Sequence, residues 1–171
     1  MKGERRLAWP ARVHDAITLV GYIGAVVCLV VIVSAYSYEV GARYFFAAPT
    51  TWASSLVSYM LVLMVFLVMP ELTRARSHIF ISILLDSMPA RRALWFQRVT
   101  FVVAAFACLL ASWFCFDATV QQFMRGISTV NEWGMPKWLL SWAIPYGLFS
   151  ASIYFLRHAA TLTSYQTSEA V

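Results

Sequence analysis

Four long apolar runs, separated by polar segments, dominate the pattern of residues along this chain. None of the four contains Asp, Glu, Lys, Arg or His, and charged residues mark both ends of each. The runs lie between Asp15 and Glu39, Arg43 and Glu71, Arg98 and Asp117, and Lys137 and Arg157. They are 23, 27, 18 and 19 residues long, and a helix needs about 20 apolar residues to cross the hydrocarbon core of a bilayer. The pattern therefore predicts four transmembrane helices.

The predicted spans cover about residues 16–38, 52–72, 97–118 and 137–157. Alternation of the kind found in barrel strands is absent, and a helix is the other structure that satisfies its own backbone inside lipid. The predicted fold class is an all-α integral membrane protein. One membrane domain covers residues 15–160, with a basic segment before it (1–14) and a tail after it (161–171).

The composition fits a membrane protein better than a soluble one. Hydrophobic residues make up 61% of the chain and charged residues 12%, whereas soluble domains have about 45–50% apolar and about 25% charged residues. The formal net charge is +5, but the basic residues do not form a continuous stripe between aromatics, as a nucleic-acid surface would require. We expect membrane lipids as partners, and no nucleic acid.

The distribution of Lys and Arg predicts the orientation of the spans. Ten of the 13 lie in the N-terminal segment, the middle segment and the C-terminal tail, and three lie in the other two loops. Loops that stay in the cytoplasm carry the excess of Lys and Arg. We therefore expect both termini and the middle segment to be cytoplasmic.

The middle segment predicts a fifth, interfacial helix over about residues 77–87. His78, Ser82 and Asp86 recur every four residues and make a narrow polar stripe, while isoleucine, leucine and phenylalanine fill the other faces. A helix with this pattern lies in the membrane interface or against a neighbouring protein.

The chain shows no recognisable chemical centre. Ionisable residues inside spans usually mark ion pathways or substrate sites, and here they are absent. The three cysteines lie within apolar runs without metal-ligand or CxxC spacing. We therefore predict no catalytic, cofactor-binding or metal-binding residues. We also predict that the protein is not an enzyme.

Several residues at the predicted span ends are candidates for structure or partner contact. Glu39 and Arg43 are four apart and are expected to pair on a helix, although a role in docking an outer partner stays open. Trp52 and Trp138 fall where an aromatic belt requires them. Pro145 is expected to kink the fourth span.

Three stretches carry a resemblance to a known family. They are RYFFAAPTTWASSL (43–56), TRARSHIFISILLDSMP (73–89) and GMPKWLLSWAIPYG (134–147). In this order they resemble the small membrane subunit of tripartite ATP-independent periplasmic (TRAP) transporters, a DctQ- or SiaQ-like subunit. The chain departs from the family's pattern at Ala53-Ser54-Ser55 and at Ser82, where the family often has acidic residues.

The resemblance implies a scaffold for a large transport subunit in the bacterial inner membrane. A periplasmic binding protein would deliver an organic acid, and sodium or another coupling ion would act in the large subunit. No cofactor is expected in this chain. The candidate partner-interface or structural residues are Glu39, Arg43, Tyr44, Trp52, His78, Ser82, Asp86, Trp138 and Pro145.

Two other classes of protein fit parts of the pattern. A free-standing four-helix channel, exporter or assembly factor would form its pathway by self-association, and polar groups would then be expected in its spans. A membrane enzyme would use His78 and Asp86 as an acid–base pair, but helical amphipathicity explains the same stripe.

Overall fold

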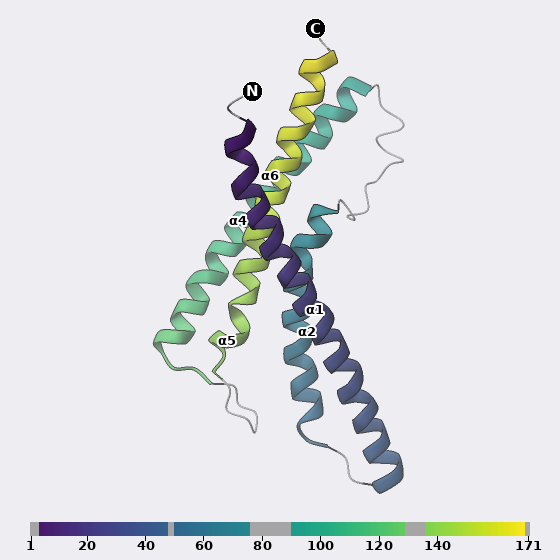
Figure 1. Ribbon diagram of the computed structural model, residues 1–171. Helices are drawn as coiled ribbons and strands as arrows, with labels where there is room; N and C mark the ends of the chain where they lie inside the picture. Colours follow the sequence, from purple (N-terminus) through teal and green to yellow (C-terminus); the bar gives the residue numbers. More distant parts are fainter. Residues whose placement is uncertain (1–3, 48–49, 76–89, 129–135, 170–171) are drawn as a thin grey trace.

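The computed structural model describes residues 4–47, 50–75, 90–128 and 136–169, and nearly all of them are helical (Figure 1). The helices are α1 (Glu4–Phe46), α2 (Ala53–Arg74), α4 (Ala90–Met124), α5 (Trp138–Ser141) and α6 (Ala143–Glu169). These described residues contain no strand, and a single bridge joins Ser128 to Pro136.

Four helical segments are long and apolar enough to cross a membrane, which confirms the predicted all-α membrane fold. They are Ala11–Phe46, Ala53–Arg74, Leu94–Met124 and Trp138–Ala160. At 1.5 Å per residue, the 43 residues of α1 extend about 65 Å, roughly twice the thickness of a hydrocarbon core. Helix α1 therefore continues beyond the bilayer unless it is very strongly tilted.

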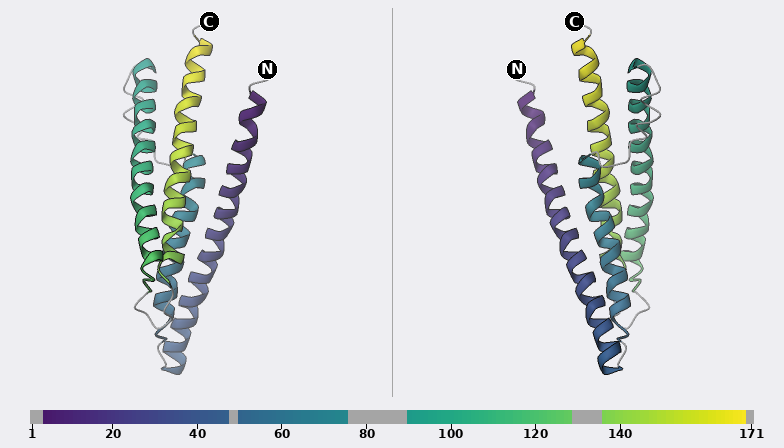
Figure 2. Two further views of the ribbon diagram at one scale, coloured as in Figure 1. Left: turned by 90° about the vertical axis from the view of Figure 1, so that its left-hand side faces the viewer. Right: turned by 90° about the vertical axis from the view of Figure 1, so that its right-hand side faces the viewer.

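The helices lie side by side in the order α1, α2, α6, α4 (Figure 2). Helices α1 and α2 form one antiparallel pair, α4 and α6 form another, and the two pairs cross (Figure 1). The contact between the pairs is mainly that of α2 with α6. The apolar window of the fourth span is 44% buried, against 17–22% in the other three, so α6 is the central helix.

The two pairs approach most closely where α6 passes the backbone of α2. A Cβ atom placed on Gly147 would lie 2.3 Å from the carbonyl oxygen of Phe66, a separation that no side chain tolerates. Pro70, which is buried, has no N–H to donate to that same carbonyl. Glycine at 147 thus lets α6 contact a stretch of α2 whose helical hydrogen bonding is interrupted.

The fourth span consists of two helices and not of the single kinked helix that the sequence predicts. It is divided at Trp142 into the short α5 and the long α6. Because Pro145 lacks an N–H, the Ser141 carbonyl has no partner one turn later, and Thr119 Oγ1 of α4 lies 3.4 Å from it. The interruption therefore follows from Pro145, as the sequence indicates, but it falls three residues before the proline.

Side-chain hydroxyls connect α4 to the fourth span at several levels. The donor–acceptor pairs are Ser152 Oγ to Ala105 O (2.9 Å), Ser112 Oγ to Pro145 O (2.9 Å), Thr119 Oγ1 to Ser141 O (3.4 Å) and Ser141 Oγ to Gln122 Oε1 (2.8 Å). Hydrogen bonds between helices in lipid contribute about 0.6 kcal/mol each on average. Together they fix the register of the α4–α6 pair.

The first connection is shorter than the sequence pattern indicates. Helix α1 continues past residue 38, the predicted end of the first span, as far as Phe46. The helix ends at Ala47, which has a positive φ of 49°, and Trp52 then precedes α2. Arg43 and Tyr44 are consequently displayed on a rigid helix.

We expect the variant Gly147→Ala to lose about 1–3 kcal/mol of stability, because the added methyl group must push α6 away from Phe66. The apparent melting temperature of the purified protein in one detergent measures this loss. Gly41→Ala is the matched control, since a Cβ there meets nothing within 4 Å. Equal melting temperatures for the two variants would contradict the close approach of α2 and α6.

Candidate functional site

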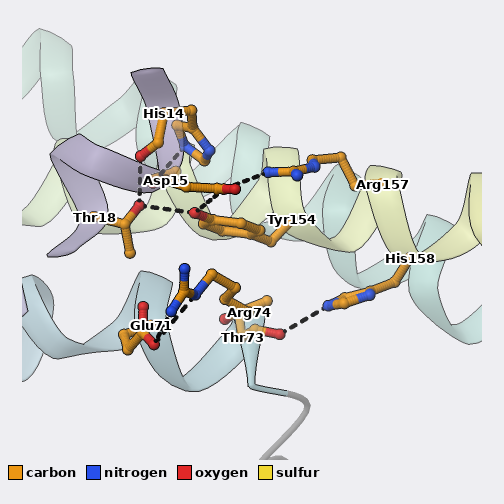
Figure 3. Close-up of polar contacts among 10 residues, drawn as sticks. His14, Asp15, Thr18, Glu71, Thr73, Arg74, Tyr154, Arg157 and His158 are labelled. Carbon is orange, nitrogen blue, oxygen red and sulfur yellow. Dashed lines mark hydrogen bonds and ion pairs between the residues drawn. The ribbon is translucent and has the colours of Figure 1, made fainter. Parts of the chain in front are cut away.

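A polar cluster joins α1 to α6 at the end of the molecule where the first and last helical residues lie (Figures 1 and 3). We define this polar cluster as His14, Asp15 and Thr18 of α1 with Ser150, Tyr154 and Arg157 of α6. Hydrogen bonds and an ion pair, more than close backbone packing, connect these two helices.

Asp15 is the centre of the polar cluster. Its Oδ1 accepts hydrogen bonds from the Tyr154 hydroxyl at 2.9 Å and from Arg157 Nη1 at 2.7 Å. The Tyr154 hydroxyl also lies 3.0 Å from Thr18 Oγ1, but a charged carboxylate is the stronger acceptor for its single proton. Tyr154 is 2% exposed, so its hydroxyl depends on these partners for the hydrogen bonds that water would otherwise supply.

His14 adds a second connection between the same helices. Its Nε2 lies 2.8 Å from Ser150 Oγ, and its ring centroid lies 4.5 Å from that of Tyr154. The Arg157 guanidinium lies over the Tyr154 ring, with its central carbon 5.2 Å from the ring centroid. The Tyr154 ring is therefore in contact with two basic side chains.

Helix α2 is attached to α6 next to the polar cluster. His158 Nε2 lies 3.0 Å from the Thr73 carbonyl oxygen, which therefore accepts a hydrogen bond from it. In α2 itself, Arg74 forms an ion pair with Glu71 at 2.8 Å (Figure 3). Charged and polar side chains of three helices thus meet at one end of the bundle.

The contact of His14 with Ser150 does not have the geometry of a hydrolase site. An activating histidine is oriented by an acid on its second ring nitrogen, but His14 Nδ1 has no hydrogen-bond partner among the described residues, and Asp15 bonds instead to Tyr154 and Arg157. Ser150 is only 3% exposed. In the described parts of the chain, no group of three potential ligands is placed to hold a metal ion. The cluster serves to connect helices.

The tip of the α1–α2 pair, at the opposite end of α1, carries four of the predicted candidates: Glu39, Arg43 and Tyr44 on α1, and Trp52 at the start of α2. The expected pair forms, with Arg43 Nη2 2.7 Å from Glu39 Oε1. Tyr44 is 81% exposed, as are the neighbouring phenylalanines to a similar degree. Trp52 packs near Tyr38, with ring centroids 5.9 Å apart. The tip of the α1–α2 pair extends past the α5 end of the bundle (Figure 2).

The remaining candidates do not join this tip. Trp138 of α5 packs edge-on against Phe123 at 5.4 Å, and Pro145 is buried with its carbonyl oxygen bonded to Ser112. The stripe of His78, Ser82 and Asp86, with its interfacial helix over 77–87, lies outside the described residues and stays a prediction. The structure therefore brings together Glu39 with Arg43, and separates them from Trp138 and Pro145.

Sequence reasoning missed the polar cluster, although a signal exists. In α6, Tyr154 lies four residues after Ser150, and Arg157 and His158 lie three and four residues after Tyr154, which places them on one face of a helix. In α1, Thr18 lies four residues after His14 and three after Asp15. Two polar stripes near the same predicted membrane surface indicate a contact, but they do not identify the partner atoms.

A comparison with protein families matches residues 32–164 to the family described as tripartite ATP-independent periplasmic transporters, DctQ component. The matched range includes the last third of α1, most of α6 and all of α2, α4 and α5. Tyr154 and Arg157 lie within it, whereas Asp15 precedes it. A comparison with curated proteins gives no significant match.

We expect Asp15→Asn to destabilise the protein by about 1–3 kcal/mol, because Arg157 and the buried Tyr154 hydroxyl both lose a charged acceptor. Apparent melting temperatures in detergent measure the effect. Asp117→Asn is the control, since this exposed acid bonds only to Gln121 within α4 in the described structure. A double-mutant cycle with Tyr154→Phe should give a less than additive loss, and full additivity would rule out the coupling of Asp15 to Tyr154.

Proposed function

Because the chain belongs to the DctQ family, the small membrane component of tripartite ATP-independent periplasmic transporters, we propose that it is the fixed scaffold for the large membrane subunit. In this proposal a soluble periplasmic protein captures an organic acid and delivers it to the complex in the bacterial inner membrane. The large subunit then moves the acid inward, driven by a gradient of sodium or another ion. This chain supplies a stationary surface.

One observation carries the scaffold proposal: the four spans have apolar stretches without any charge, and the hydroxyls within them bond to backbone carbonyls of the bundle. Ser112, Ser152 and Thr119 donate to carbonyl oxygens of their own helix or of a neighbouring one. A path for an organic anion or a cation needs polar groups that face a water-filled or substrate-filled space. The chain is thus better suited to support a transport pathway than to form one.

The exposed surface of the bundle also supports a role within a complex. Large apolar side chains are exposed on α1 from Val13 to Phe46 and on α4 from Trp95 to Met124. In a bilayer these faces contact lipid or the helices of another subunit. With the α1–α2 pair crossing the α4–α6 pair (Figure 1), the faces point in different directions and give the large subunit a broad surface.

We also propose that the tip of α1 forms part of a periplasmic rim that contacts the binding protein. Glu39 restrains Arg43 through their ion pair, and Tyr44 extends from the same rigid helical turn. The Trp52 ring packs near Tyr38 of α1, and this contact fixes the position at which α2 enters the membrane. The rim is the surface that an approaching soluble protein would meet first.

Purification of the tagged chain from native membranes in a mild detergent tests the scaffold proposal. We expect a stoichiometric, larger multi-span protein to co-elute, and transport in proteoliposomes to need both subunits together with the binding protein. If the chain elutes alone or only with itself, the proposal fails. A free-standing channel, exporter or assembly factor then becomes the better account.

The orientation can be tested by introducing one additional cysteine at a time and labelling it with a membrane-impermeant maleimide. We expect Tyr44→Cys to react in spheroplasts with an intact inner membrane, because the rim is proposed to face the periplasm. Arg92→Cys, which is also exposed, should react only after permeabilisation. The unmodified chain corrects for its own three cysteines, which lie within α1 and α4. The reverse labelling pattern would mean that the termini face the periplasm.

A further inference from the structure

An apolar groove of about 810 Å³ lies between α4 and the fourth span. We call it the α4–α6 groove and define it by Leu110, Trp113 and Phe116 of α4 with Trp142, Tyr146 and Phe149 opposite. The hydroxyls of Ser112 and Thr119 also border the groove, but both are already bonded to backbone carbonyls. The groove therefore offers an almost wholly apolar surface.

The walls of the α4–α6 groove suit a flexible chain better than a helix. Trp113 is 71% exposed and Phe149 51%, so large rings stand along both sides. Small residues at a contact favour the close approach of helices in lipid, and these large rings would keep the backbone of another helix farther away. A hydrocarbon chain bends and fits between irregular rings without that requirement.

Two cations lie beyond the end of the groove at the α4–α5 connection. Arg125 follows α4 and Lys137 precedes α5, and both are exposed. A hydrogen bond of 3.0 Å from Lys137 N to Ile127 O holds the two segments together. Neither cation forms an ion pair with a described residue. The acid on the last part of α4, Asp117, accepts a hydrogen bond from Gln121 in its own helix.

From an apolar groove with two cations beyond one end, we infer that this chain binds a phospholipid. One acyl chain lies in the α4–α6 groove, and the phosphate lies near Arg125 and Lys137. Arg125 and Lys137 carry two positive charges at this end of the groove, which favours an anionic lipid over a zwitterionic one. This inference goes beyond the scaffold role and does not depend on which solute the transporter carries.

The position of the acyl chain can be tested in the reconstituted complex with its large subunit. The probe is phosphatidylglycerol with a diazirine in one acyl chain, and mass spectrometry maps the labelled residues. We expect the label to concentrate on groove residues such as Trp113 and Phe149. Leu110→Trp should fill the groove and reduce this labelling, whereas Phe114→Trp is the control, since Phe114 is exposed on the same helix and does not line the groove.

The position of the phosphate is tested by native mass spectrometry of the same complex. A cation that contacts an anionic headgroup contributes about fivefold to the binding of that lipid. We therefore expect Arg125→Gln with Lys137→Gln to lower the retention of phosphatidylglycerol, and to change that of phosphatidylcholine much less. Arg98→Gln is the control, because Arg98 is exposed near the other end of α4.

Three results would overturn the inference. The first is labelling spread evenly over the exposed face of α4, which indicates ordinary annular lipid. The second is labelling of the large subunit in place of the groove, which indicates that protein covers it. The third is equal retention of phosphatidylglycerol by the double variant and the Arg98 control, which removes the role of the two cations.

Discussion

The contact between the Gly147 backbone and the Phe66 carbonyl positions α6 against α2, and the rest of the bundle depends on where α6 lies. Inside lipid, apolar surface gives helices little reason to associate, so close packing and hydrogen bonds must hold them. With α6 in this place, Tyr154 and Arg157 reach Asp15 on one side. On the other side, Ser112 and Ser152 join α4 to α6. One glycine thus aligns contacts on two faces of the central helix.

Two prolines explain why neighbouring helices meet where they do. Pro70 deprives the Phe66 carbonyl of its helical donor, and Pro145 does the same to Ser141. In each case another helix lies at the freed carbonyl: Gly147 at the first, and Thr119 at 3.4 Å from the second. Because an unsatisfied carbonyl is costly in lipid, a proline within a span favours a neighbour at that level.

The four spans and the Glu39–Arg43 pair could be predicted, because both depend on residues close together in sequence. The ends of the helices could not be predicted in the same way, since α1 continues to Phe46, well past the predicted end of the first span at residue 38. The contacts of Asp15 with Tyr154 and Arg157 could not be predicted from the sequence either. They require the rotation of each helix and the order in which helices pack, and neither is encoded in the periodicity of one segment. Pro145 indicated an interruption in the fourth span, but the structure has it three residues earlier, at Trp142.

The central position of α6 has a consequence for how the protein is made. Of the described helices it is synthesised last, so α1, α2 and α4 are made before the helix that connects their two pairs. Each must be stable in lipid by itself, which their long, charge-free apolar stretches permit. Until α6 arrives, Asp15 near the membrane surface has no Arg157 beside it. A nascent chain interrupted before Gly147 would therefore lack the contacts of α6 with α2 and α4, and its bonds to Asp15.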